Sequence, residues 1–351
     1  MKQETIIKGF AQLGKLMRAL GNSKEWADFS VGVTKQEYEA LEYTINRQFA
    51  YNGWFVKENV RLSLLSLGNE LTEEKLTAWA GNYTYSENAK RVGVIMAGNI
   101  PLVGFHDFLS VLISGNHVIA KLSSDDATLL PKLAEHLIQF SPELESRITF
   151  SQGRIGQVDA VIATGSNNSL KYFEQYFGKY PHIFRKNRTS LAVLDGTETK
   201  EQLFELGRDI FQYFGLGCRN VSHLMIPQDF ELNRFFEGIV DHGNVVNNNK
   251  YGNNYDYNKA IFLMNKSELL DNNFLLLRES DELFSPLSML HYQRYSDTSE
   301  VKDFLELHKN NLQVVVGNQY APFGEAQAPG LSDYADGVDT MQWLSEIRNK
   351  E

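Results

Sequence analysis

The sequence predicts an α/β protein with two doubly wound domains of mainly parallel strands and a layer of helices at the N-terminus. Its 351 residues, 42% of them hydrophobic, are enough for two separate cores. Between Ile6 and Tyr83, apolar residues recur every three or four positions, which is the period of an amphipathic helix. From Arg91 onward, short apolar runs alternate with amphipathic stretches, and this alternation is typical of β-α-β units.

The expected elements follow in order along the chain. In the N-terminal layer, the spacing of Phe10, Leu13 and Met17 predicts a helix with one apolar face. Beyond Arg91, the apolar runs predict strands at 92–97, 117–121, 147–150, 159–163, 191–194 and 221–226. The stretches between them predict helices at 103–113, 127–140 and 170–177.

The C-terminal part repeats this pattern after an irregular stretch. Residues 242–258 are rich in Asn, Gly and Tyr, which predicts a loop. After it, apolar runs predict strands at 261–264, 287–292 and 312–317, with a helix at 301–307.

Charge and composition exclude several classes of protein. The formal net charge of −10 and the pI near 5.4 leave no general attraction for nucleic acids or anionic membranes. The N-terminus leads into an amphipathic pattern, so neither a secretion signal nor a membrane span is predicted, and we expect a cytoplasmic protein. A single cysteine excludes an intramolecular disulfide, and the eight histidines lack the close pairing of a zinc site, so no metal is expected.

The only cysteine, Cys218, lies in a glycine-flanked turn between an expected helix and the apolar strand 221–226. A thiol titrates at about 8.5, so it is a good nucleophile only where amides or a cation stabilise its anion. Gly215 and Gly217 leave backbone amides uncovered and let a substrate carbonyl come close. The turn therefore indicates a nucleophile, and the alternative is a small apolar residue packed beneath a turn.

This turn is one of six short motifs along the chain. In order they are Gly98-Asn99-Ile100-Pro101-Leu102, Lys121-Leu122-Ser123-Ser124, Thr164-Gly165-Ser166, Gly217-Cys218, Glu282-Leu283-Phe284-Ser285-Pro286 and Pro322-Phe323-Gly324. Together they resemble the aldehyde dehydrogenase superfamily. The short chain and degenerate motifs most resemble its LuxC-type acyl-CoA reductases, the fatty acid reductases of bacterial light-emitting systems and their non-luminous relatives. The resemblance spans about Arg91 to Trp343.

The resemblance implies a covalent mechanism. Cys218 would attack an acyl carbonyl and carry the acyl group as a thioester. Asn99 and the backbone N–H of Cys218 would donate hydrogen bonds to the oxyanion, where losing one donor typically costs about 3 kcal/mol of barrier. Phe323 would line the acyl tunnel. The local alternatives are an ordinary turn residue for Asn99 and a core aromatic for Phe323.

The resemblance also implies a nicotinamide cofactor. Lys121, at the end of an apolar strand, would contact the adenosine ribose. NAD-preferring relatives usually carry Glu three residues later, and this chain has Ser124 there, which removes repulsion toward a 2′-phosphate. NADPH is therefore favoured over NADH, although Asp125 or Asp126 would reverse this preference if either faced the ribose.

Two further motifs complete the expected cofactor site. Gly165 and Ser166 precede an expected helix, whose N-terminal amides suit a pyrophosphate or the nicotinamide side, with a simple helix cap as the alternative. By resemblance, Glu282 bonds the nicotinamide ribose and Phe284 packs near its ring, with a surface turn as the alternative. Ser285 replaces the usual Gly of this motif.

A departure from the superfamily pattern indicates the reaction. Aldehyde-oxidising members activate water with a Glu just before a strand, whereas the corresponding residues 184–190 contain no carboxylate. General-base assistance is worth about 10²–10⁴-fold, so the thioester at Cys218 should hydrolyse slowly. Arg185, Lys186 and Arg188 in this stretch form a basic cluster that would meet coenzyme A phosphates, or else a solvated charged edge.

The leading hypothesis is NADPH-dependent reduction of an acyl-CoA, expected to be fatty acyl, to the aldehyde. The alternatives are reduction of an acyl phosphate or a carrier-protein thioester, and a non-catalytic acyl- or nucleotide-binding subunit. Residues 1–184, completed by 318–351, would form the cofactor domain, and residues 185–317 the catalytic domain. Related enzymes commonly exchange a strand between subunits, which makes a homodimer the partner arrangement to test.

Overall fold

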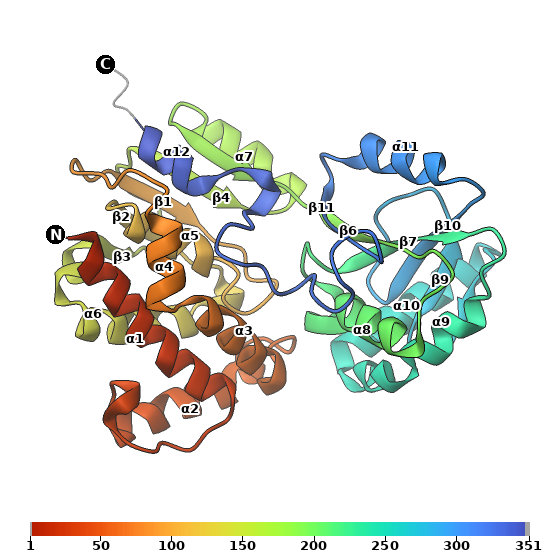
Figure 1. Ribbon diagram of the computed structural model, residues 1–351, viewed down its shortest axis with the longest axis horizontal. Helices are drawn as coiled ribbons and strands as arrows, with labels where there is room; N and C mark the ends of the chain where they lie inside the picture. The colour runs from red at the N-terminus through yellow and green to blue at the C-terminus, as the bar shows by residue number, and fades with distance from the viewer. Residues whose placement is uncertain (1, 348–351) are drawn as a thin grey trace. The chain divides into compact units, whose positions relative to one another are not determined.

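The computed structural model describes residues 2–347 and divides into two compact units (Figure 1). The first contains the described residues up to Lys186 together with those from Gly330 onward, and the second spans Asn187–Pro329. The predicted boundaries lay at 184 and 318. Because the observed second unit extends to Pro329, residues 318–329 belong to it and not to the first unit. The functions predicted for the two domains stay predictions.

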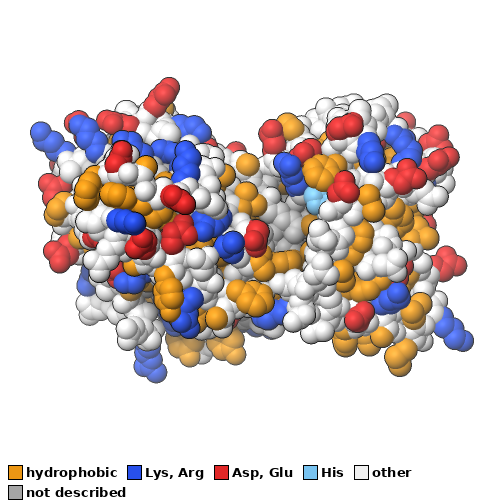
Figure 2. Space-filling view, turned by 90° about the horizontal axis from the view of Figure 1, so that it is seen from below, with side chains coloured by type: hydrophobic (Ala, Val, Ile, Leu, Met, Phe, Trp, Pro, Cys, Tyr) orange, Lys and Arg blue, Asp and Glu red, His pale blue; other side chains and the backbone are white. Residues whose placement is uncertain are grey.

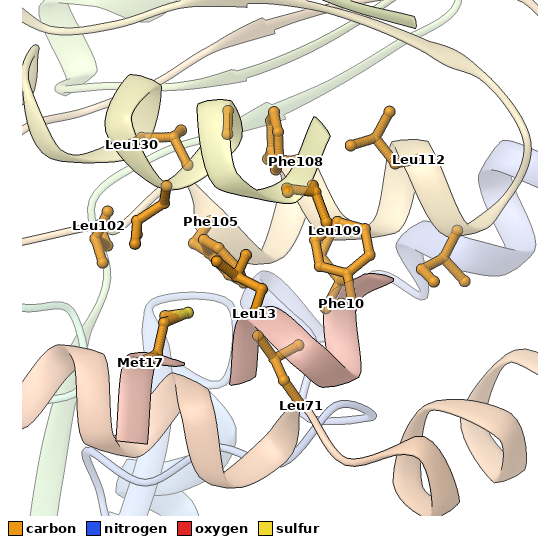
Figure 3. Packing of buried hydrophobic residues seen from close by; sticks show 14 of the residues in the cluster. Phe10, Leu13, Met17, Leu71, Leu102, Phe105, Phe108, Leu109, Leu112 and Leu130 are labelled. Carbon is orange, nitrogen blue, oxygen red and sulfur yellow. The ribbon is translucent and has the colours of Figure 1, made fainter. Parts of the chain in front are cut away.

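The first unit begins with the expected helical layer. Its helices are α1 (Gln3–Gly21), α2 (Lys35–Tyr51), α3 (Lys57–Glu70) and α4 (Glu73–Ala80). Apolar residues of α1 pack on α5 (Phe105–Ile113), where the Phe10 ring meets those of Phe105 and Phe108 at centroid distances of 6.4 Å (Figure 3). This spacing is typical of edge-to-face aromatic pairs, which stabilise a core beyond their buried area.

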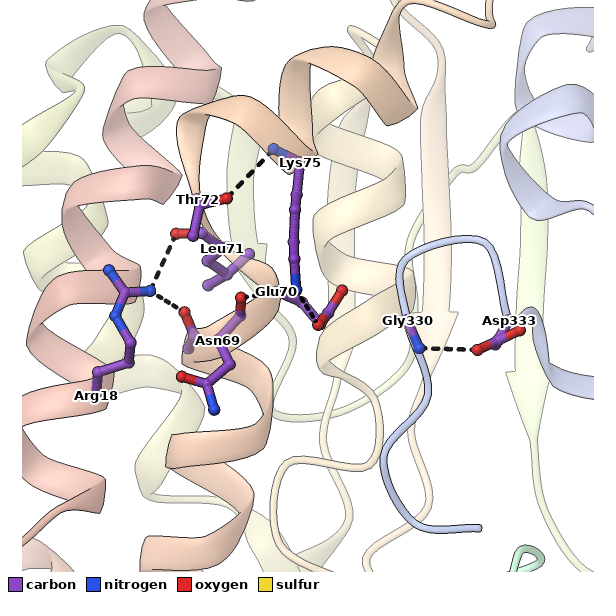
Figure 4. A network of polar contacts seen from close by, with 9 residues as sticks. Arg18, Asn69, Glu70, Leu71, Thr72, Lys75, Gly330 and Asp333 are labelled. Carbon is purple, nitrogen blue, oxygen red and sulfur yellow. Dashed lines mark hydrogen bonds and ion pairs between the residues drawn. The ribbon is translucent and has the colours of Figure 1, made fainter. Parts of the chain in front are cut away.

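Polar contacts also fasten α1 to α3. The Arg18 guanidinium donates to the carbonyls of Gly68 and Leu71 at the C-terminal end of α3 (Figure 4). These carbonyls lack helical partners, so a cation there satisfies both hydrogen bonding and the helix dipole. Next along the chain, the Thr72 hydroxyl caps α4 by accepting from the Lys75 amide at 3.2 Å.

Behind the helices stands a five-stranded parallel sheet in the order β3-β2-β1-β4-β5. Its strands are β1 (Arg91–Ile95), β2 (His117–Lys121), β3 (Ile148–Phe150), β4 (Ala160–Thr164) and β5 (His182–Arg185). Helices α6 (Leu129–Phe140) and α7 (Asn167–Phe177) connect successive strands. From β1 the chain runs outward through β2 and β3 and then returns to β4, so the strand order reverses between β1 and β4.

The C-terminal segment completes this unit. Trp79 donates to the Tyr334 hydroxyl at 2.8 Å, the Tyr83 hydroxyl donates to Asp339 at 2.9 Å, and His106 bonds the Leu331 carbonyl at 2.9 Å. The segment then forms α12 (Thr340–Glu346). The first unit is therefore assembled from two stretches of chain.

The second unit holds a six-stranded sheet in the order β11-β6-β7-β10-β9-β8. Its strands are β6 (Thr189–Val193), β7 (Val221–Pro227), β8 (Leu270–Asp271), β9 (Leu276–Glu279), β10 (Met289–Tyr295) and β11 (Leu312–Val316). All neighbours pair in parallel except β8 and β9. The helices are α8 (Lys200–Phe211), α9 (Leu232–Ile239), α10 (Asn249–Met264) and α11 (Thr298–His308). The two parallel-stranded sheets confirm the predicted α/β class.

The loop predicted at 242–258 is wrong. Most of it is helical, as a 3-10 stretch over Val240–Asn247 and then α10, whose C-terminal end also contains the strand predicted at 261–264. The Asn248 side chain caps α10 by accepting from two first-turn amides. The buried face consists of Tyr251, Tyr255 and Asn258, so polar and aromatic residues occupy positions where an amphipathic pattern would carry aliphatic ones.

The surface of each unit mixes charges of both signs on the face drawn in Figure 2. This mixing accompanies the net negative charge of the chain. Among residues 2–347, none of the helices combines the length and apolar character needed to cross a bilayer.

Candidate active site

In the first unit, the predicted cofactor residues gather at one edge of the sheet. Ile95, the last residue of β1, is in register with Lys121 at the end of β2 and with Ala163 near the end of β4. Because parallel strands end on the same side, the Asn99 loop, Lys121 and the Gly165-Ser166 turn share this edge. It includes the point where the strand order reverses, which is where open α/β sheets bind nucleotides.

The loop that carries Asn99 is built on the segment that carries Ser124. A Cβ on Gly98 would lie 2.7 Å from the Ser123 side chain, so only glycine permits this approach. The Asp126 carboxylate accepts from the Leu102 amide at 2.7 Å, and Leu102 has a positive φ of 60°. Asn99 itself is exposed.

The Asp126 side chain is directed into the Asn99 loop. It is buried, one of its oxygens is bonded to the Leu102 amide, and burial raises its pKa to about 6. Ser124, Asp125 and Lys121 are exposed at the same edge. Of the two acids that could reverse the preference for NADPH, Asp126 is therefore bonded to the loop that carries Asn99, and Asp125 is the one that is exposed.

Gly165 and Ser166 form the entry to α7. The Ser166 hydroxyl accepts from the Ser169 amide at 3.3 Å, so the simple cap is present. A Cβ on Gly165 would lie 2.9 Å from the Ser169 Cβ, which explains the glycine. The capped N-terminus of this helix also presents first-turn amides at the edge described above, and such a terminus suits a pyrophosphate. The residues present therefore fit a dinucleotide.

In the second unit, Cys218 is exposed on the turn that leads into β7. The preceding 3-10 stretch (Gln212–Gly215) contains Tyr213 and Phe214 at φ values of 53° and 59°, followed by Gly215 at 79°. Three consecutive left-handed residues turn the chain sharply from the end of α8. The exposure of Cys218 contradicts the alternative of a residue packed beneath the turn.

Asn220 holds this turn together and was not identified from the sequence. Its side-chain oxygen accepts from the Gly217 amide at 2.7 Å. Its amide nitrogen lies 3.0, 3.3 and 2.9 Å from the carbonyls of Asp209, Ile210 and Gln212 at the end of α8. Asn220 is buried, so water does not reach its polar atoms and these hydrogen bonds within the protein satisfy them.

The segment that carries Phe323 lies against the same turn. The buried Asp209 carboxylate accepts from the amides of Gly324 and Ala326 at 2.7 and 3.0 Å. Arg219, next to Cys218, donates to the Ala326 carbonyl at 3.4 Å. Burial raises the pKa of Asp209 to about 6. Phe323 is itself buried, and its contact with the acyl chain stays a prediction.

Glu282 and Phe284 are exposed on the connection between β9 and β10. The Glu282 carboxylate lies 3.8 Å from the Arg278 guanidinium. His223, five residues after Cys218, is a buried residue of β7 whose Nδ1 bonds the Glu282 carbonyl at 3.1 Å. This bond directs the imidazole to the Glu282 connection.

The basic cluster expected at residues 185–188 is not a single surface. Arg185 is buried, forms an ion pair with Asp107, and donates to the Thr340 hydroxyl at 2.8 Å. Lys186 is exposed. Arg185 therefore belongs to the core of the first unit. There the Asp107 carboxylate pairs with its guanidinium, as a buried charge requires. Within residues 2–347, no group of three or more His, Cys, Asp or Glu side chains is placed to hold a metal ion.

Comparisons with known proteins agree with this architecture. The family model described as acyl-CoA reductase (LuxC) matches residues 23–229, more than half of the chain. The long-chain acyl-protein thioester reductase 2 of Photobacterium leiognathi is 22% identical, over 90% of this chain and 68% of that protein.

Solved structures show the same fold. An NAD-dependent aldehyde dehydrogenase from Sinorhizobium meliloti superposes with a TM-score of 0.65 at 11% identity, covering 91% of this chain and 71% of that one. A mutant of the P. syringae indole-3-acetaldehyde dehydrogenase AldA, in complex with NAD+ and IAA, gives 0.64 at 12% identity, with 91% and 72% covered. At these identities the likeness establishes the fold, and it confirms the aldehyde dehydrogenase-like class.

Proposed function

The chain belongs to the LuxC family of acyl-CoA reductases and is an oxidoreductase that acts on acyl or aldehyde groups, and on that premise we propose that it reduces a fatty acyl-CoA to the aldehyde through Cys218. The observation that carries the proposal is the exposed thiol on a turn fixed from behind by Asn220. A nucleophile needs both access and a fixed direction, and this turn supplies both.

The first half of the reaction transfers the acyl group. The Cys218 thiolate attacks the thioester carbon, forming a new C–S bond while the carbonyl oxygen becomes an oxyanion. That oxyanion accepts a hydrogen bond from the Cys218 backbone amide, and the resemblance assigns a second donor to Asn99. Collapse breaks the bond to the coenzyme A sulfur, which leaves as a thiolate and takes a proton from solvent.

The second half needs a bound nicotinamide cofactor, which supplies a hydride to the acyl carbon. In our proposal Lys121, Ser124, Gly165 and Ser166 hold its adenosine and pyrophosphate, at the strand ends where they gather. Ser124 and the hydrogen bond from the Leu102 amide to Asp126 favour NADPH over NADH, whereas the exposed Asp125 at the same edge would favour NADH if it faced the ribose. Glu282 and Phe284 would receive the nicotinamide ribose and ring.

Residues 184–190 contain no carboxylate to activate water, so the acyl group would remain on Cys218 long enough to be reduced. Reduction gives a hemithioacetal, and breaking its C–S bond releases the aldehyde and restores the thiol. Because this cycle requires a reduced thiol, the proposal includes a reducing compartment such as the cytoplasm.

A second acyl donor, a protein-bound thioester, is favoured by a specific observation. The relative from Photobacterium leiognathi is named as an acyl-protein thioester reductase, and the acyl-transfer chemistry is the same for a protein-bound thioester. Acyl phosphates would react at Cys218 in the same way. The non-catalytic alternative predicts nucleotide binding without oxidation of the cofactor.

One experiment tests the proposal. Purified protein is incubated with radiolabelled hexadecanoyl-CoA in the absence of nicotinamide, and the label on Cys218 is located by peptide mapping. We expect stoichiometric labelling, its loss in Cys218→Ala, and its release as aldehyde when NADPH is added. Absence of label from acyl-CoA, acyl phosphate and acyl-carrier-protein donors alike would leave only the binding subunit. Sedimentation of the same sample tests the predicted homodimer.

A further inference from the structure

The connection between β9 and β10 crosses the sheet without a helix. Parallel neighbours usually need a dozen or more residues and a helix for this crossover, whereas residues 280–288 here are irregular. An irregular segment cannot satisfy its own backbone groups, so its carbonyls need partners from elsewhere. The segment carries Glu282 and Phe284.

Two buried histidines supply those partners. His223 of β7 and His291 of β10 are directly in register on adjacent strands, and their Nδ1 atoms lie 3.1 and 2.8 Å from the same carbonyl oxygen, that of Glu282. A carbonyl only accepts, so each Nδ1 must carry a hydrogen, and the two donors use both lone pairs. The Ser222 hydroxyl donates to the next carbonyl, that of Leu283, at 3.1 Å.

Holding the loop with this histidine pair costs free energy, because it buries polar ring atoms. His223 and His291 are 0% and 1% exposed, and the Nε2 atom of each is buried without a hydrogen-bond partner. The His223 ring stacks on Phe304 of α11 at a centroid distance of 4.9 Å. Apolar side chains would avoid burying these polar atoms, but they would leave the Glu282 carbonyl without donors.

We propose that His223 and His291 are positioning residues for the cofactor, because they fix the backbone from which the Glu282 carboxylate and the Phe284 ring project. Both of those side chains extend outward, with the Glu282 side chain 68% exposed. β7 carries His223 and begins three residues after Cys218, so one strand anchors both the nucleophile turn and the cofactor segment. This inference rests on the roles proposed above for Glu282 and Phe284.

The test compares His291→Leu with His291→Asn. Leucine removes the donor, whereas the asparagine amide places a donor near the position of Nδ1. Binding of NADPH is measured by fluorescence titration, and KM and kcat are measured with hexadecanoyl-CoA. We expect His291→Leu to raise the Kd and KM for NADPH about tenfold or more, and His291→Asn to stay within about threefold of wild type.

Acylation of Cys218 without cofactor is the internal control, because it needs the nucleophile turn but not Glu282. We expect its rate to stay within about twofold of wild type in both variants. His242→Leu is the matched control, since His242 in the same unit also bonds a carbonyl, that of Phe204 at 2.9 Å, and should lower stability without changing the Kd for NADPH.

Ser222→Ala keeps both histidines in place, and it decides the question if His291→Leu does not fold. A rise of more than about threefold in its Kd, with unchanged acylation, supports positioning. An unchanged Kd in every folded variant, or a Kd and acylation rate that worsen together, overturns the inference. If wild type binds NADPH but is never acylated, it is the proposed function that fails, and the Kd comparison still stands.

Discussion

Asn220→Ala should destabilise the second unit strongly. The substitution removes the acceptor for the Gly217 amide and the donors for carbonyls at the end of α8. Two amide hydrogens and one oxygen make three bonds, each worth about 1 kcal/mol, and the buried partners are left unsatisfied. We therefore expect a loss of about 3 kcal/mol, which is a shift of about 1.5 M urea at an m-value of about 2 kcal/mol/M.

The assay exploits the position of the tryptophans. All four, at 26, 54, 79 and 343, lie in the first unit, so tryptophan fluorescence follows that unit and far-UV circular dichroism follows both. Asn318→Ala is the matched control. Asn318 is exposed and bonds Asp195 at 2.9 Å, so water replaces its partners and the loss should stay below about 1 kcal/mol. A dichroism midpoint that moves no further in Asn220→Ala than in Asn318→Ala would refute the reasoning.

Three further substitutions test the first unit. Burial raises the pKa of Asp126 from 3.8 to about 6. The unfolded chain therefore loses this proton at a lower pH than the folded protein does, and the free energy of unfolding falls as the pH rises through this window. Asp126→Asn should therefore add about 3 kcal/mol at pH 7.5, a gain that disappears below pH 4 in urea titrations and that a pH-independent difference would contradict. Gly98→Ala forces a Cβ to within 2.7 Å of Ser123 and should cost about 1–3 kcal/mol, largely recovered by adding Ser123→Gly; failure of that rescue would exclude the contact as the cause. Arg185→Met leaves the Asp107 carboxylate buried and unpaired and should cost about 3–5 kcal/mol by thermal and urea unfolding, whereas adding Asp107→Leu should restore most of it; equal losses in the single and double variants would argue against pairing.

The fold was largely predictable because its signals are local. A buried strand such as β4 is a continuous apolar run, and α5 and α6 show their period within a dozen residues. The signal failed at α10, whose buried face is made of tyrosine and asparagine. It also failed to predict β5 and β8, which lack a long apolar run, and it missed β9, although β9 continues the apolar run 274–277.

The candidate site was predictable only in part. The glycines and Cys218 mark turns that can be identified from neighbouring residues, and their order indicated the family. The supporting contacts join residues far apart in sequence, such as Arg185 with Asp107 and Asp209 with Gly324. No pattern in a single sequence indicates which buried acid meets which amide. The same holds for Asn220, whose side chain is recognisable as a turn brace only once α8 and β7 are placed.

The return of the chain to the first unit affects how the protein is made. A ribosome releases residues 187–329 before it releases the segment that pairs Tyr334 with Trp79 and Thr340 with Arg185. The later unit can thus mature while the earlier one still waits for its closing piece, the reverse of the usual order for nascent chains. During that interval the binding surface for Tyr334 and Leu331 on α4 and α5 stays uncovered.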